Sequence, residues 1–266
     1  MDNSRYTYTK IAVAATYLIM VFVNGLANAL PINGVTTGQV SDSYPDLFAP
    51  AGLTFSIWGL IYILLAAYTL YQFGLFQSDK GAGRVELFQS IGLLFIISSI
   101  ANTIWIFAWH YDAIGFSLLM MIVILVCLIL IATRLREEQF SLKEKILIRL
   151  PFSVYFGWIT VATIANVTTY LVSVGWGGFG ISEQFWTVLI LLVGVAIGIA
   201  RMFRDRDIAY GLVIVWAYAG IWIKHASPAE FAGHYPAVIS AAAISILLLL
   251  VAQGYLIYTG GRKEAA

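Results

Sequence analysis

Aromatic and amide side chains recur every three or four residues in three apolar segments, and together they suit the binding of a flat, mostly apolar molecule. Residues at this spacing share one face of a helix. Ring faces supply contact area, and a few hydrogen-bonding groups set the ligand's orientation. Ordinary helix packing is the commoner cause of such spacing and stays open as the alternative. The three sets are Phe55, Trp58 and Tyr62; Ser98, Asn102, Trp105 and Trp109; and Tyr155, Trp158, Ala162 and Asn166.

Other kinds of chemistry find little support in the apolar segments. No nucleophile, base and orienting group occur together there, so we predict no catalytic site and no enzyme. No ionisable residue is expected deep within a segment, which argues against proton-coupled transport. Lys224 is the one candidate for a retinal Schiff base, and it lies at the end of its segment. His110, His225 and His234 are placed in connections at irregular spacing, so we predict no metal site and no cofactor.

The composition indicates that the segments cross a membrane. Of 266 residues, 61% are hydrophobic and only 11% are charged, whereas soluble domains carry about 25% charged residues. Apolar runs of roughly 18 residues or more are typical of membrane-spanning helices. The net charge of +1 gives no reason to expect a nucleic-acid partner. We predict an all-α, polytopic membrane bundle of eight helices, at 11–30, 52–73, 87–109, 114–133, 150–171, 185–203, 208–223 and 236–258.

The basic residues orient these helices. Lys and Arg accumulate in short cytoplasmic segments, and with eight spans every Lys and Arg except Lys224 falls on the side of the two termini. We therefore predict that both termini are cytoplasmic. The seventh run is the weakest, because its length as a helix is only ~24 Å. Omitting the sixth and seventh runs together would keep the same parity and is the main alternative.

Amide and indole side chains then gather at one depth, in the outer half of the membrane. Asn24, Asn28, Asn102 and Asn166 all lie there, although each could instead join two helices by hydrogen bonds. Tryptophan also favours this half. We interpret Trp176, Trp186 and Trp222 as anchors at the outer interface, whereas Trp58 and Trp158 lie deeper.

The longest connection, residues 31–51, is predicted to be an ordered outer loop. Gly34, Gly38, Pro45 and Pro50 punctuate it, and Leu47 and Phe48 offer apolar side chains to pack. No convincing internal repeat is visible, which argues against an inverted-repeat transporter. The single cysteine, Cys127, excludes an intrachain disulfide and is expected only to pack.

The three sets of residues resemble the tryptophan-rich sensory protein family, also called the translocator protein or peripheral benzodiazepine receptor family. Its second helix has the form F-x-x-W-x-x-x-Y, its third N-x-x-W and its fifth Y-x-x-W-x-x-x-A-x-x-x-N. This chain carries all three patterns in the same order, after a comparably long first loop. The matching residues are Phe55, Trp58 and Tyr62; Asn102 and Trp105; and Tyr155, Trp158, Ala162 and Asn166.

The resemblance covers residues 10–172 and divides the chain into two parts. Residues 1–172 would form the family's five-helix unit, and residues 173–266 a three-helix C-terminal extension with no counterpart in that unit. The first loop also departs from the family pattern, because it contains neither the tryptophan nor the lysine usual there. Ligand contacts made by the family's loop are therefore not carried over to this chain.

The resemblance implies a membrane receptor or sensor for porphyrin-like tetrapyrroles, and in some members sterols. The ligand-binding residues would be Phe55, Trp58, Tyr62, Asn102, Trp105, Tyr155, Trp158 and Asn166. The alternatives are a transporter for a small solute and a protein that modifies porphyrins in light. The expected partners are the ligand, membrane lipids and a second copy of the chain in a homodimer. The short loops suit a prokaryotic plasma membrane.

Overall fold

The computed structural model describes residues 3–30, 32–75 and 84–264. Side chains are described from Tyr6 to Gly260 within these ranges. Pro31 of the predicted loop and Lys80 of the charge pattern lie outside the described residues. The side chains of Arg5, Arg262 and Lys263 lie outside them as well.

Eight helices in the described part of the chain are long and apolar enough to span a membrane, as predicted. The seventh extends beyond its predicted apolar run to Ala226, giving 19 residues, or ~28 Å. This length is close to the ~30 Å of a hydrocarbon core. The eight helices are α1 (Asn3–Ala29), α3 (Ile57–Gln72), α4 (Val85–His110), α5 (Ile114–Arg136), α7 (Leu150–Ser173), α8 (Glu183–Asp205), α9 (Ile208–Ala226) and α10 (Pro236–Glu264).

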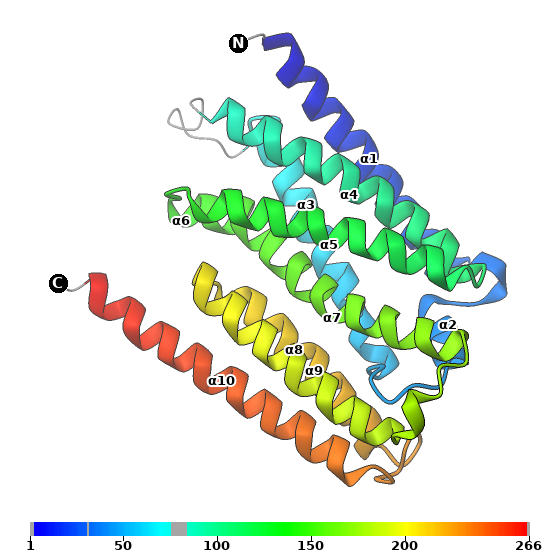
Figure 1. Ribbon diagram of the computed structural model, residues 1–266. Helices are drawn as coiled ribbons and strands as arrows, with labels where there is room; N and C mark the ends of the chain where they lie inside the picture. Colours follow the sequence, from blue (N-terminus) through cyan, green and yellow to red (C-terminus); the bar gives the residue numbers. More distant parts are fainter. Residues whose placement is uncertain (1–2, 31, 76–83, 265–266) are drawn as a thin grey trace.

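The helices lie side by side, and both termini are at the same end of the bundle (Figure 1). Helix α4 packs between α1 and α5, while α9 packs against α10. Helix α7 is central, since it contacts α3, α5, α8 and α9. The segment from Pro151 to Val161 is buried at every position, as expected of a helix with neighbours on all sides.

Helices α7 and α9 approach each other closely at Gly157. A Cβ atom at this position would lie 2.8 Å from the Tyr210 carbonyl oxygen and 2.9 Å from the Val213 Cβ. These distances are shorter than ordinary van der Waals contact, so only glycine fits without moving a helix. The close packing of α7 against α9 at Gly157 thereby holds the adjacent residue, Trp158, in position.

The connection between α1 and α3 folds over the end of the bundle opposite the termini (Figure 1). It contains η1 (Ile32–Gly34), α2 (Thr37–Ser43) and η2 (Gly52–Ser56), with short irregular segments between them. A capping box begins α2: the Thr36 hydroxyl accepts from the Gln39 N–H, and the Gln39 side chain accepts from the Thr36 N–H. Leu47 and Phe48 are buried, so the prediction of an ordered loop is confirmed. We refer to residues 32–56 as the α1–α3 loop.

Helix α9, in the C-terminal part of the chain, makes several contacts that hold this loop in place. The Lys224 ammonium lies 2.8 Å from Asp42 Oδ1. His225 Nε2 lies 2.8 Å from the Leu47 carbonyl oxygen, and the Ala51 N–H donates to the Gly220 carbonyl at 3.1 Å. The C-terminal part of the chain therefore positions the loop that closes the N-terminal part.

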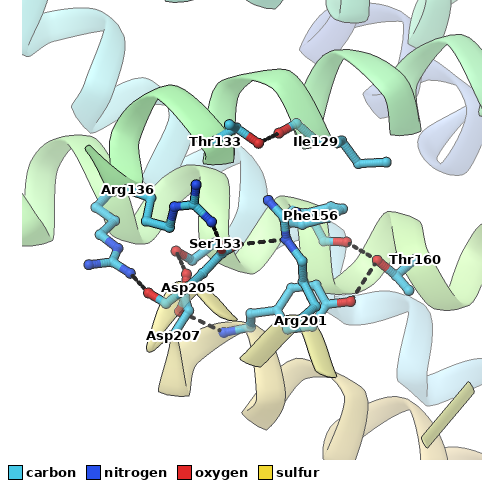
Figure 2. A network of polar contacts seen from close by, with 11 residues as sticks. Ile129, Thr133, Arg136, Ser153, Phe156, Thr160, Arg201, Asp205 and Asp207 are labelled. Carbon is cyan, nitrogen blue, oxygen red and sulfur yellow. Dashed lines mark hydrogen bonds and ion pairs between the residues drawn. The ribbon is translucent and has the colours of Figure 1, made fainter. Parts of the chain in front are cut away.

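A network of charged residues joins α5, α7, α8 and α9 near the terminal end (Figure 2). Arg201 Nε lies 2.6 Å from Asp205 Oδ2, and Arg136 Nη1 lies 3.7 Å from Asp205 Oδ1. The Ser153 hydroxyl donates to Asp207, whose Oδ1 accepts from the Tyr210 N–H and caps α9.

Arg201 is the cation at the centre of this network, and it falls inside the predicted apolar run 185–203. The residue lies within α8, and its side chain is only 12% exposed. Its guanidinium covers the Phe156 ring at 5.1 Å. A buried charge is tolerated there because the partner carboxylate of Asp205 comes from the same helix, four residues on.

Candidate functional site

An aromatic cluster centred on Trp58 lies beneath the α1–α3 loop. The Trp58 ring stacks on Tyr62, with ring centroids 5.6 Å apart and an interplanar angle of 21°. It lies 6.2 Å from Trp105, 6.0 Å from Tyr155 and 6.1 Å from Trp158. Edge-to-face and offset contacts at these distances hold the rings in fixed orientations. All three sets of residues singled out in the sequence therefore meet at one place.

A small cavity of about 40 Å³ opens among these rings, and we call it the cup. It is lined by rings from α3, α4 and α7, by the polar groups of Asn166 and Thr169, and by four residues of the loop. No charged residue lines it within the described part of the chain. Its lining residues are Thr37, Ser41, Pro50, Phe55, Trp58, Trp105, Trp109, Met121, Trp158, Val161, Ala162, Ala165, Asn166 and Thr169.

Five of the eight predicted site residues line the cup: Phe55, Trp58, Trp105, Trp158 and Asn166. The other three support it instead. Tyr62 stacks behind Trp58, while Asn102 Nδ2 donates to the Tyr155 hydroxyl at 3.2 Å. A hydrogen bond between α4 and α7 therefore supports the aromatic wall from behind.

This hydrogen-bonded set extends to α1 through Asn24. Asn24 Nδ2 donates to Asn102 Oδ1 at 2.8 Å, and it also donates to the Met20 carbonyl at 2.9 Å. Asn28, by contrast, donates within its own helix, to the Asn24 carbonyl. Of the four asparagines predicted to lie at one depth, Asn24 and Asn102 are therefore hydrogen-bonded to each other. Asn28 is exposed at the surface of α1.

A second set of hydrogen bonds fixes Asn166 at the wall of the cup. Asn166 Oδ1 accepts from Trp105 Nε1 at 3.0 Å and from the Ser117 hydroxyl at 3.3 Å. Its Nδ2 lies 3.1 Å from the same hydroxyl oxygen. Because its oxygen and nitrogen are both engaged within the protein, Asn166 positions Trp105 as much as it faces the cavity.

One indole group in the cup has no such partner. Trp158 Nε1 is buried and makes no hydrogen bond with any described residue, and only 3% of the side chain is exposed. An N–H group left unpaired in an apolar setting costs free energy comparable to a lost hydrogen bond. Trp158 therefore offers a donor that an occupant with an acceptor atom can use.

Several lining residues were not among the predicted site residues. Thr37, Ser41 and Pro50 come from the loop, and Met121 comes from α5. Helix α5 is apolar all round and carries no motif that would single out Met121. Trp109 does belong to the third predicted set, and its Nε1 donates to the Thr37 carbonyl at 3.1 Å. Its position four residues beyond Trp105 was the available signal.

The histidines also differ from expectation. His110 is the last residue of α4 and His225 lies in the last turn of α9, so placing them in connections was wrong. Both are buried, and their ring nitrogens contact the Ile106 and Leu47 carbonyls respectively. Among the described residues, no group of three or more His, Cys, Asp or Glu is arranged to hold a metal ion.

Comparison with known families gives one match. The model of the family described as "TSPO-like protein" matches residues 10–255. This match runs beyond the predicted boundary at residue 172 and includes most of the three C-terminal helices. No curated protein and no solved structure matches the chain.

Proposed function

Because the chain belongs to the TSPO-like protein family, we propose that it is a membrane receptor that binds a hydrophobic ring compound in the cup without chemically changing it. A porphyrin-like tetrapyrrole is the first candidate and a sterol the second. Both classes present a large apolar face, which aromatic walls accommodate. The absence of charge from the described lining of the cup favours the apolar part of such a ligand over its ionised substituents.

The unpaired indole N–H of Trp158 is the observation that carries this proposal. Trp158 lines a cavity whose other walls are mostly rings and aliphatic side chains. A tetrapyrrole nitrogen or carbonyl, or a sterol hydroxyl, supplies the acceptor that the protein lacks there. One directional contact within an apolar pocket is the usual way to orient a ligand of this kind.

The volume of the cup implies that binding requires the α1–α3 loop to move. About 40 Å³ accommodates one or two water molecules, and ligand sites for drug-sized molecules typically measure roughly 300–1,000 Å³. Ser41 and Pro50 of the loop line the cavity, as do the half-buried Phe55 and Trp58. We propose that a ring ligand displaces the loop and separates the Trp58 and Trp158 rings, a form of induced fit.

Fluorescence titration tests the proposal. Protoporphyrin IX added to the purified protein in dodecyl maltoside is expected to quench tryptophan emission with saturation. Trp158→Phe keeps an aromatic ring, although a smaller one, but removes the N–H, and it should weaken the affinity at least tenfold, as expected for loss of a buried hydrogen bond.

Trp222→Phe is the matched control, because Trp222 is 41% exposed and does not line the cup. It should bind as the unsubstituted protein does. Unsaturable quenching, or equal affinity in Trp158→Phe, would contradict the proposal. Bleaching of the porphyrin spectrum in light would instead favour the porphyrin-modifying alternative.

We further propose that the protein resides in a plasma membrane with both termini in the cytoplasm. The support is the distribution of Lys and Arg, since among the side chains that the structure describes only Lys224 lies at the end of the bundle opposite the termini. A cysteine replacing Glu230, exposed in the α9–α10 turn, should react with an impermeant maleimide added to intact cells. A cysteine replacing Glu137, at the end of α5, should react only after lysis. The reverse pattern would place the termini outside.

A further inference from the structure

A second and larger cavity, of about 210 Å³, lies at the same end of the bundle as the cup and is lined by other residues of α7. The α1–α3 loop, the end of α7, the start of α8 and the α7–α8 connection line it, and it shares no lining residue with the cup. The side chains used in the argument below are Asp46, Phe48, Trp176, Glu183 and Trp186, all of which line it.

Asp46 is the unusual residue of this cavity, because a buried carboxylate normally has all its acceptors engaged. Only 8% of Asp46 is exposed. Its Oδ1 accepts the backbone N–H groups of Phe48 at 2.9 Å and Ala49 at 2.8 Å. Its Oδ2 is buried and has no hydrogen-bond partner among the described residues. One oxygen therefore shapes the loop, and the other is left without a hydrogen-bond donor in a residue that lines the cavity.

The charge of Asp46 persists at neutral pH. Burial raises the pKa of this carboxyl group to about 6, and the backbone N–H groups of Phe48 and Ala49, the Lys224 ammonium and the Thr168 side chain keep it from rising further. Glu183, exposed at the start of α8, adds a second carboxylate to the lining. No described lining residue is basic, so the cavity attracts cations and repels anions.

Aromatic rings form another wall. Trp176 and Trp186 have ring centroids 5.2 Å apart at an angle of 59°. The Trp186 Nε1 group donates to the Gly178 carbonyl at 3.0 Å, which fixes that ring. Gly178 has a φ of +59°, and a Cβ there would meet Trp186 Nε1 at 3.3 Å, so the turn favours glycine for two reasons.

We propose that this second cavity binds a small organic ammonium ion whose aromatic or aliphatic body packs on Trp176 and Trp186 while its N–H groups reach Asp46. A buried carboxylate with a free oxygen and nearby indole faces is a combination that recognises such cations through an ion pair and cation–π contact. An anion meets two carboxylates instead. A neutral apolar molecule leaves Asp46 Oδ2 unsatisfied. The volume limits the occupant to a molecule smaller than a typical drug.

Calorimetric titration with tryptamine tests this inference. The probe carries a primary ammonium on an indole body, and neutral dodecyl maltoside micelles avoid non-specific attraction of the cation. We expect saturable binding that Asp46→Asn weakens at least tenfold. The amide oxygen of asparagine can still accept from Phe48 and Ala49, so the loop is retained while the charge is lost. The neutral analogue 3-ethylindole should bind at least tenfold more weakly than tryptamine.

Asp112→Asn is the matched control, because it removes the same charge at the same end of the bundle. Asp112 is exposed and bonds to the Tyr44 hydroxyl outside this cavity. It should leave the tryptamine affinity unchanged. If Asp46→Asn does not fold, Trp176→Ala provides the test, since this partly exposed ring can be removed without opening the core. No tryptamine binding, or equal binding by Asp46→Asn and the unsubstituted protein, would overturn the proposal.

The pH dependence adds an independent readout. Tryptamine keeps its positive charge from pH 7.5 to 5, whereas Asp46 takes up a proton near pH 6, so affinity should fall by about tenfold over this range. The other charged or titratable groups around Asp46 are Glu183 of α8, Lys224 of α9 and His225, which contacts the adjacent Leu47 carbonyl. Glu183→Gln should retain the decrease and Asp46→Asn should abolish it. A decrease that survives in Asp46→Asn would contradict the assignment.

The ammonium group can come from a free amine or from the headgroup of an ethanolamine phospholipid. Short-chain phosphatidylethanolamine added to the titration distinguishes these sources, with phosphatidylglycerol of the same chain length as the control. Competition by the ethanolamine lipid alone identifies a lipid headgroup as an occupant. Absence of competition by either lipid identifies a free amine. Failure of the cup variant Trp158→Phe has no bearing on this result, because Trp158 does not line the second cavity.

Discussion

Replacing Arg201 by methionine is expected to lower the free energy of unfolding by about 3 kcal/mol, because it leaves the buried carboxylate of Asp205 without its nearest counter-charge. Asp205 is 6% exposed, and its remaining partner, Arg136, is 3.7 Å away and more exposed than Arg201. Methionine keeps much of the aliphatic volume that packs beside Phe156. Unfolding in mixed micelles titrated with sodium dodecyl sulfate measures the change.

Two further variants define the cause. Arg204→Met removes a charge from the same turn of α8, but Arg204 is exposed, so its effect should stay within about 0.5 kcal/mol. The double variant Arg201→Met, Asp205→Met removes both charges and should recover most of the loss, since apolar replacement of a whole buried pair is often neutral. A double variant no more stable than Arg201→Met would show that packing, and not the unpaired charge, causes the effect.

Substituting Gly157 by alanine is expected to cost about 2 kcal/mol, although alanine is intrinsically the better helix former. The added methyl group would lie 2.8 Å from the Tyr210 carbonyl oxygen, a backbone atom that cannot rotate away. Helices α7 and α9 must therefore separate. The same unfolding titration measures the loss, and protoporphyrin titration should show weaker binding because Trp158 moves with α7.

Gly254→Ala is the control for this substitution. Gly254 lies within α10, and a Cβ there would meet no heavy atom within 4 Å. The variant should be as stable as the unsubstituted protein or gain up to about 1 kcal/mol from helix propensity. Equal stability of the two alanine variants would refute the close approach of α7 and α9 as the cause.

The spanning helices and the meeting of the three residue sets followed from sequence alone, because both depend on local patterns. An apolar run reports length against the bilayer, and spacing of three or four reports a shared helix face. Trp58, Trp105 and Trp158 were singled out in this way, and they lie together. Their role in binding a ligand stays a prediction.

The spacing of residues shows which of them share a helix face, but it does not show what that face packs against. Tyr62, Asn102 and Tyr155 have the spacing of their neighbours, yet they stand behind the cup as supports. Trp176 and Trp186 were interpreted as anchors at the outer interface, yet they line a cavity together with Asp46. That cavity depends on residues more than 120 positions apart, for which no local pattern exists. The close approach at Gly157 likewise depends on the opposing surface of α9.

The hold of α9 on the α1–α3 loop has a consequence for how the protein is made. The side-chain contacts between them join residues 162 to 182 positions apart: Trp216 to the Thr54 carbonyl, His225 to the Leu47 carbonyl, and Lys224 to Asp42. During synthesis the first five spanning helices enter the bilayer well before the seventh emerges from the ribosome. Until then the loop lacks its contacts with α9. A nascent chain therefore passes through a stage in which the helices around the cup are in place but the loop is not yet held over it.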